Sequence, residues 1–170
     1  MEKTSPSKTG CNIASVNRQI MSVARDAALV YADTGEERYG KMAAKVFEVY
    51  MKGIACRNVP TDLNHGHQQT LVGMTTFEVI HEDIINELTQ MYPLIRNLVK
   101  NDQAKIDAGF KKWAENIIAN GVPHNNWNLF QADFIVKIAL VLQDNNAYAD
   151  GKGKQYYLDY VVNQNSIRQW

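Results

Sequence analysis

The sequence lacks a long hydrophobic run and an excess of charge of one sign, and it has only two cysteines among its 170 residues. Without an apolar stretch of membrane-spanning length, we expect no contact with a membrane. Eighteen basic and eighteen acidic residues leave a formal net charge of +0, so we expect no nucleic-acid partner. Cys11 and Cys56 have no CxxC spacing, which argues against a zinc ribbon and a redox motif. Because the net charge is zero, any anionic ligand must be bound by groups close to it rather than attracted by the charge of the whole protein.

The N-terminal sequence MEKTSPSKTG carries two lysines that no apolar run of signal-peptide length follows. As written, the chain is expected to stay in the cytoplasm. We interpret the two cysteines as buried free thiols, and a disulfide between them is the alternative if the protein is exported.

Apolar residues recur every three or four positions in six segments, which is typical of helices that bury one face. The series run over residues 13–31, 39–51, 77–98, 106–117, 129–142 and 156–167. Pro93 is expected to kink or split the third helix. No segment alternates like a strand, so the sequence predicts an all-α fold of successive antiparallel helix hairpins. We expect a poorly ordered N-terminus over 1–11 and one helical domain over 12–170.

Two segments stand out from this pattern. The segment 129–142 is apolar on most of its circumference, which predicts a central helix. The segment 53–73 shows no sustained period and is interpreted as a long loop. Long ordered loops in compact domains are often functional, so Asn64 and His65 in this loop are candidate ligand contacts.

The histidines offer only weak metal motifs. Glu78 and His81 have the Glu-x-x-His spacing of di-iron bundles, but those bundles need a second copy, which the sequence lacks. His65 and His67 lie two apart, so in an extended stretch they point to opposite faces. We expect no metal and no cofactor. A catalytic serine elbow and a phosphate-binding glycine loop are also missing.

The polar entry to the fifth helix is the strongest candidate site. Asn125 and Asn126 precede Trp127, which joins a flat apolar face to two neutral amides at the start of a helix. Such a pair suits carbohydrate, because an aromatic ring stacks on a pyranose while amides bind hydroxyls or a carboxylate. In the structural alternative, one asparagine caps the helix and Trp127 packs in the core.

Two stretches resemble the polysaccharide lyases with an (α/α) toroid, the alginate lyase and heparinase II/III group. The first stretch is a turn between paired helices, Asp33-Thr34-Gly35-Glu36-Glu37-Arg38-Tyr39 followed by Ala43 and Ala44. The second is Asn125-Asn126-Trp127-Asn128-Leu129-Phe130-Gln131, which enters a hydrophobic helix. The resemblance covers most of the chain from about residue 12 and implies that its hairpins form part of an (α/α) toroid.

The resemblance implies β-elimination of the bond to O4 of a uronic acid. Asn126 matches the position of the asparagine that holds the substrate carboxylate and stabilises the enolate-like intermediate. Trp127, Asn125, His124, Asn64 and His65 are the candidate substrate contacts, and the expected partner is an anionic, uronic-acid-containing polysaccharide. Several members have a histidine directly after the asparagine, whereas here that position is Trp127. The base must then come from elsewhere, and His124, His65 and Tyr157 are the local candidates.

The C-terminal sequence reads as a helix that continues to Trp170 without a C-cap glycine, so we expect a piece of a longer polypeptide. In heparinase-like members a catalytic tyrosine and a β-sandwich histidine follow this region. The resemblance thus implies the N-terminal helical part of a lyase whose intact parent would be periplasmic or secreted. Such a piece would expose helix faces and self-associate, and it could be inactive alone.

A second hypothesis belongs to another functional class. In a non-catalytic carbohydrate-binding or scaffold module, Asn126 would only cap a helix and Trp127 would only provide a stacking platform. A tyrosine-bearing helix and a strand-rich domain downstream would favour the lyase, and their absence would favour the module.

Overall fold

A computed structural model describes residues 13–56, 83–99, 102–120 and 126–163. Within these ranges six α-helices and one 3-10 turn are present, and none of the described residues forms a strand. The predicted all-α class is confirmed. The elements are α2 Ile13–Thr34, α3 Glu37–Cys56, α6 Asp83–Ile95, α7 Gln103–Asn120, α8 Asn126–Val141, η3 Asn145–Ala147 and α9 Lys154–Asn163.

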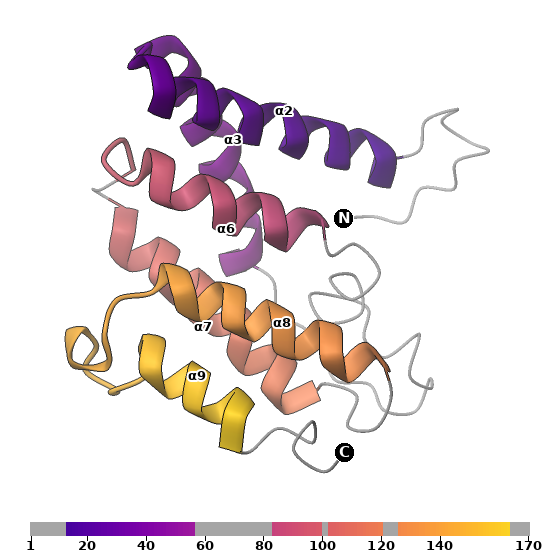
Figure 1. The fold of residues 1–170 in the computed structure, drawn as a ribbon, viewed down its shortest axis with the longest axis vertical. Coiled ribbons are helices and arrows are strands. Elements are labelled where there is room, and N and C mark those ends of the chain that lie inside the picture. Colours follow the sequence, from indigo (N-terminus) through magenta and orange to yellow (C-terminus); the bar gives the residue numbers. More distant parts are fainter. Residues whose placement is uncertain (1–12, 57–82, 100–101, 121–125, 164–170) are drawn as a thin grey trace.

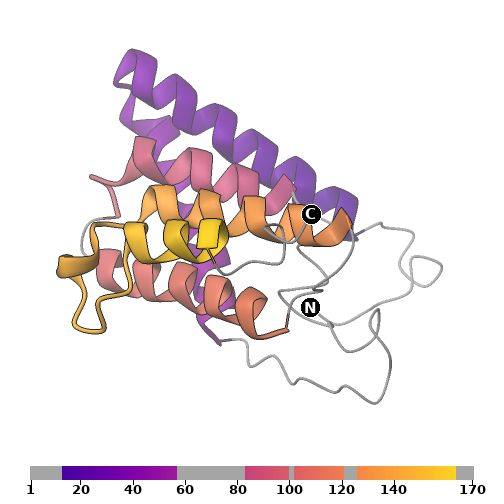
Figure 2. The same ribbon diagram turned by 60° about the horizontal axis from the view of Figure 1, so that its bottom comes forward.

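The helices are arranged as stacked hairpins (Figures 1 and 2). One layer is formed by α2, α6 and α8, with α6 packed against both of the others. Behind it, α3 packs against α2 and α7, whereas α9 packs against α8 at the lower edge of the layer in Figure 1. The helices of the first layer run in the same direction, and α3, α7 and α9 return in the opposite one (Figure 1). Short connections therefore lie at one end of the array, where α2, α6 and α8 end.

The turn between α2 and α3 confirms the predicted break at Asp33-Thr34-Gly35. Gly35 has a φ of 74°, a left-handed conformation that a glycine adopts at low cost, and its N–H donates to the Tyr31 carbonyl at 2.8 Å. The Glu36 N–H donates to the Thr34 hydroxyl at 3.2 Å. Because only two residues separate the helices, α2 and α3 must pack as an antiparallel hairpin.

The centre of the core is an aromatic cluster between α3, α6 and α7. The Phe47 ring stacks on Tyr92, with centroids 5.2 Å apart and an interplanar angle of 9°. The Phe110 centroid lies 6.2 Å from that of Phe47 and 5.7 Å from that of Tyr92. All three side chains are fully buried. These contacts join three helices that are far apart in sequence.

Two helix ends differ from the sequence-based expectation. Residues 53–56 were expected to begin the long loop, but α3 continues to Cys56, and Met51 is buried beneath its last turns. The third helix does not reach Leu98: α6 contains Pro93, ends at Ile95, and is followed by a turn in which the Leu98 N–H donates to Ile95 O at 2.9 Å. Proline removes one helical N–H and crowds the preceding turn, so Pro93 weakens the helix within its last turns.

The described helix α8 packs against α6, α7 and α9, in agreement with its expected central position. Its inward face at the C-terminal half is apolar, with Phe134, Ile135 and Ile138 at most 1% exposed. No helix in the described part of the chain is long and apolar enough to cross a membrane. The predicted N-terminal segment 1–11 lies outside the described residues.

Candidate functional site

The candidate catalytic residue Asn126 is the first residue of α8. It lies at the end of the array opposite the short connections, where α3 and α7 end and α6 begins (Figure 1). The first turn of any α-helix has N–H groups without intrahelical partners and carries a partial positive charge, so the start of the sixteen-residue α8 is a favourable place for an anion.

The remaining predicted contacts cannot be placed. His124, Asn125, Asn64 and His65 lie outside the described residues, as do Glu78, His81 and His67. Asn126 and Trp127 have a described helical backbone, but their side chains belong to the part left undescribed. The structure thus fixes where α8 starts, and the side-chain geometry of the predicted site remains a prediction.

The first two turns of α8 place polar side chains inside and apolar ones outside. Asn128 is 7% exposed and Gln131 is 2% exposed, whereas Leu129 is 58% exposed. The sequence reasoning assigned Leu129 and Phe130 to the apolar series and overlooked the two amides. A signal was present, because steps of three and four residues back from buried Ile135 lead to Gln131 and Asn128.

These buried amides indicate a polar interior near the start of α8. Burial of an amide carries a free-energy cost unless it is hydrogen-bonded, and both residues make polar interactions. Two such groups immediately after Asn126 and Trp127 make this end of the array more polar than the aromatic centre of the core.

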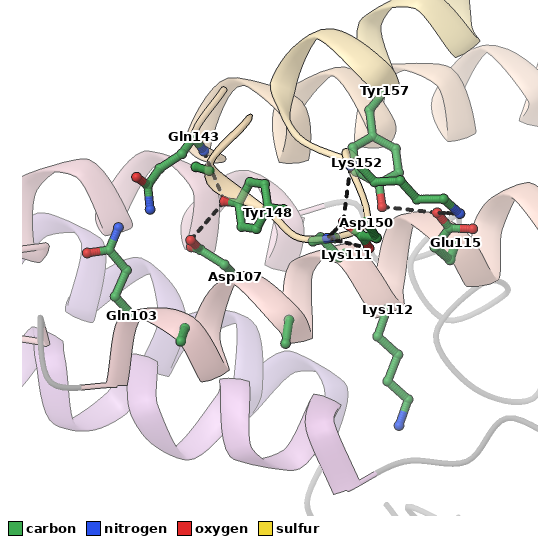
Figure 3. Close-up of a pocket in the computed structure, with 13 residues that line it drawn as sticks. Gln103, Asp107, Lys111, Lys112, Glu115, Gln143, Tyr148, Asp150, Lys152 and Tyr157 are labelled. Atoms are coloured by element: carbon green, nitrogen blue, oxygen red, sulfur yellow. Dashed lines mark hydrogen bonds and ion pairs between the residues drawn. The ribbon is translucent and has the colours of Figure 1, made fainter. Parts of the chain in front are cut away.

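A second polar region is a cavity of about 810 Å³ between α7 and the connection from α8 to α9 (Figure 3). Asp107 and Glu115 project into it from α7, while Tyr148 and Lys152 come from the connection (Figure 3). Its lining residues are Gln103, Ala104, Asp107, Ala108, Lys111, Lys112, Glu115, Gln143, Ala147, Tyr148, Asp150, Lys152 and Tyr157. Three lysines and three carboxylates make the lining electrically balanced.

Asp107 is the centre of a buried hydrogen-bond network in this cavity. Its carboxylate accepts hydrogen bonds from two phenols: Tyr92 donates to Oδ1 at 3.2 Å and Tyr148 donates to Oδ2 at 2.8 Å. The Tyr148 oxygen also accepts the Gln143 N–H at 3.0 Å. Burial, opposed by the Gln143 N–H and reinforced by the Asp107 carboxylate, raises the pKa of Tyr148 to about 12.

Two ion pairs fasten the same connection to α7. Lys111 donates to both carboxylate oxygens of Asp150, at 2.6 and 2.7 Å, and its ammonium lies 4.3 Å from the centre of the Tyr148 ring. Lys152 pairs with Glu115 at 2.9 Å. Because these charged groups are already paired with each other, the cavity is better suited to hold the connection in place than to bind an anionic polymer.

Tyr157 was one local candidate for the catalytic base, and the cavity gives it a different environment. It is fully buried, and its hydroxyl donates to Glu115 at 3.1 Å. Burial and the neighbouring carboxylate raise its pKa well above the ordinary value for tyrosine. A phenol held neutral in this way is a poor proton acceptor, so Tyr157 stabilises the packing of α9.

Replacing Tyr148 by phenylalanine is expected to lower the free energy of unfolding by about 1–3 kcal/mol at neutral pH, because Asp107 loses a buried donor. In the folded protein the pKa of Tyr148 is raised from 10.0 to about 12. Its contribution is therefore complete below pH 10 and is lost as pH rises through the folded pKa. Urea unfolding at neutral pH and under alkaline conditions measures both effects.

The Tyr148→Phe protein should consequently lose less stability than the original protein when the pH is raised. Tyr39→Phe is the matched control, since the Tyr39 hydroxyl accepts an exposed hydrogen bond from Arg38 at 3.1 Å. Equal stability of the Tyr148→Phe and original proteins at neutral pH would contradict the proposed importance of the network.

No group of three or more His, Cys, Asp and Glu side chains suited to a metal ion is found in the described part of the chain.

Comparison with known protein families gives a match over most of the chain. The family described as alginate lyase matches residues 4–164 of the 170. This range includes all six described helices and every candidate site residue. No curated protein and no solved structure matches the chain.

Proposed function

The chain belongs to the alginate lyase family, and from this premise we propose that it takes part in β-elimination of a uronic-acid-containing polysaccharide. The observation that carries the proposal is the position of Asn126 at the start of α8, within a match that covers residues 4–164. The resemblance of Asn125-Asn126-Trp127 to the family's helix entry assigns the roles of these residues.

The reaction requires that the C5 proton of the uronate be made acidic. While the neighbouring carboxylate is ionised, the charge that develops on proton removal is poorly stabilised. A neutral donor such as the Asn126 amide can hold this carboxylate and stabilise the enolate-like intermediate. The partial positive charge of the α8 N-terminus adds to the same effect.

The elimination also requires a group that accepts a proton and a group that donates one. A base accepts the C5 proton, the electron pair forms the C4–C5 double bond, and the C4–O4 bond breaks as the leaving oxygen is protonated. His124 and His65 are the remaining local candidates for the base, because Tyr157 is engaged with Glu115. Trp127 is assigned to stacking on a sugar ring.

The stacking of hairpins supports the toroid part of this proposal. Three helices of one direction form a layer, and their partners return behind or beside them. In this arrangement α8 presents its N-terminus at the end where α3 and α7 finish. Loops from several hairpins can therefore contribute to one substrate site.

An activity screen tests the proposed reaction. Incubation with alginate, heparan sulfate, chondroitin sulfate and hyaluronan is expected to produce ultraviolet absorbance from the unsaturated product with at least one polymer. Dextran, which contains no uronic acid, is the control. The contrary outcome is that the polymers bind to the chain, or to a longer form that includes it, and none yields the ultraviolet absorbance of an unsaturated product. That outcome supports a non-catalytic binding module, and the lyase proposal is then wrong.

A further inference from the structure

The outer side of the α2/α3 hairpin carries most of the exposed apolar surface described. Seven of the eleven large hydrophobic side chains that are exposed in the described ranges lie on these two helices. They form a terminal pair of the array, with α2 at its edge (Figure 1). Contiguous exposed apolar surface on a helical protein is typical of an interaction site.

Four of the five exposed large apolar residues of α2 form a stripe. Spacings of four, three and seven place them on one side of the helix. The stripe consists of Val16, Ile20, Val23 and Val30, which are 38%, 44%, 57% and 39% exposed. Arg25 points to the other side, where it pairs with Glu87 of α6 at 3.1 Å. The stripe therefore faces away from α6.

A shorter stripe on α3 has the same orientation. Met42 and Val49 lie seven residues apart and are 42% and 60% exposed. On the opposite side of α3, Phe47 stacks on Tyr92 of α6 and Met51 approaches Gly109 of α7. Both stripes thus face outward, along the seam between α2 and α3.

Exposed charges of opposite sign border this seam. On α2, Asp26 and Asp33 lie beside the apolar stripe, on the side away from α3. On α3, Arg38, Lys45 and Lys52 recur every seven residues beyond Met42 and Val49. One border is therefore acidic and the other mainly basic, although Arg38 also pairs with Glu36 of its own chain at 2.8 Å.

The register of the hairpin sets these charges level with one another. A side chain at Gly40 would meet the Tyr31 ring at 2.7 Å, so these two positions lie side by side. In an antiparallel pair, five residues back from Tyr31 and five forward from Gly40 reach Asp26 and Lys45. Two residues forward from Tyr31 and two back from Gly40 reach Asp33 and Arg38.

This pattern is self-complementary. If a second copy faces the first about a two-fold axis parallel to the helices, α2 of each copy lies on α3 of the other. The apolar stripes then meet, and Asp26 faces Lys45 while Asp33 faces Arg38 across the interface. Asp26 also accepts an Arg25 bond at 2.7 Å, and a carboxylate has room for further donors.

We propose that two copies of this chain form a symmetric dimer through the outer side of the α2/α3 hairpin, with the Asp26 border of each copy against the Lys45 border of the other. The apolar stripes supply the affinity, and the charged borders select the register. This interface does not involve α8, so the proposal stands apart from the lyase activity.

Sedimentation equilibrium of the full chain over a wide concentration range tests the interface. The original chain is expected to sediment as a dimer in equilibrium with monomer. Val23→Asp should raise the dimer dissociation constant by about 100-fold or more, because each interface contains the residue twice. Val162→Asp, on α9 and 66% exposed, is the matched control and should leave the constant unchanged. Circular dichroism verifies that both variants fold.

Charge reversal tests the register. Asp26→Lys and Lys45→Asp should each weaken the dimer by about 10-fold through like-charge contacts. The double variant should recover to within about 3-fold of the original, since the pair is restored across the interface. Asp26 and Lys45 lie on opposite borders of one chain, so recovery within a monomer is not expected.

Three results would overturn the proposal. They are a monomer at every concentration, a dimer that Val23→Asp weakens no more than Val162→Asp does, and a double charge reversal that fails to recover affinity. Larger assemblies that persist in the Val23→Asp variant would likewise place the contact elsewhere, for example on the exposed Leu129 and Leu140 of α8.

Discussion

Replacement of Asn126 by alanine is expected to lower the elimination rate by about 100-fold or more, as the loss of a donor to a developing oxyanion does in other enzymes. The free energy of unfolding should hardly change, because the residue would act on the substrate. Turnover is measured by ultraviolet absorbance on whichever polymer the chain, or a longer form that includes it, cleaves. Thermal unfolding of the same samples gives the stability.

Asn126→Asp separates catalysis from helix capping. Aspartate caps a helix as well as asparagine does, and its charge suits the N-terminus of α8. It lacks the amide donor and would repel a uronate carboxylate, so the rate should fall at least as far as in the alanine variant. If Asn126→Ala loses about 1 kcal/mol of stability while the folded protein stays fully active, the residue is only a cap and the proposed site is wrong.

The largest effect on stability is expected for Phe47→Ala, at about 3–5 kcal/mol. Phe47 is fully buried where α3, α6 and α7 meet, and its ring stacks on Tyr92. Removal of the ring loses apolar burial and leaves a cavity that three helices cannot easily close. For a chain of this length the midpoint of thermal unfolding should fall by roughly 10 °C, which calorimetry measures.

Two variants control for this loss. Phe47→Leu keeps most of the volume and should destabilise the protein by less than about 1.5 kcal/mol. Phe130→Ala removes the same ring from a position that is 39% exposed, and its effect should be much smaller. Similar losses in Phe47→Ala and Phe130→Ala would show that the aromatic cluster is not the centre of the core.

The helices and the first turn could be predicted from sequence because their causes are local. The three- and four-residue periodicity of α2 and α3 and the Gly35 turn lie within a few residues of the structure they determine. The start of α8 was located in the same way, from a polar entry before an apolar series. Boundaries were less accurate: α3 continued to Cys56, because the residues at 53–56 contain no strong helix breaker apart from Gly53.

The inner face of α8 could not be chosen so easily. Its sequence is apolar on most of its circumference, so periodicity alone does not say which side is buried. Packing against α6, α7 and α9 decides the matter. It turns Asn128 and Gln131 inward and leaves Leu129 exposed.

The sequence by itself predicted an all-α chain of hairpins and, through the two stretches at 33–44 and 125–131, the family that the match over residues 4–164 confirms. Only the tertiary structure joined Asp107 to Tyr148 and Glu115 to Tyr157, which are about forty residues apart, and so gave Tyr157 a structural role. Helix periodicity arises from neighbours three and four positions away, whereas these contacts depend on how hairpins stack. No local pattern in the sequence predicts contacts between residues that lie so far apart, so only the tertiary structure shows them.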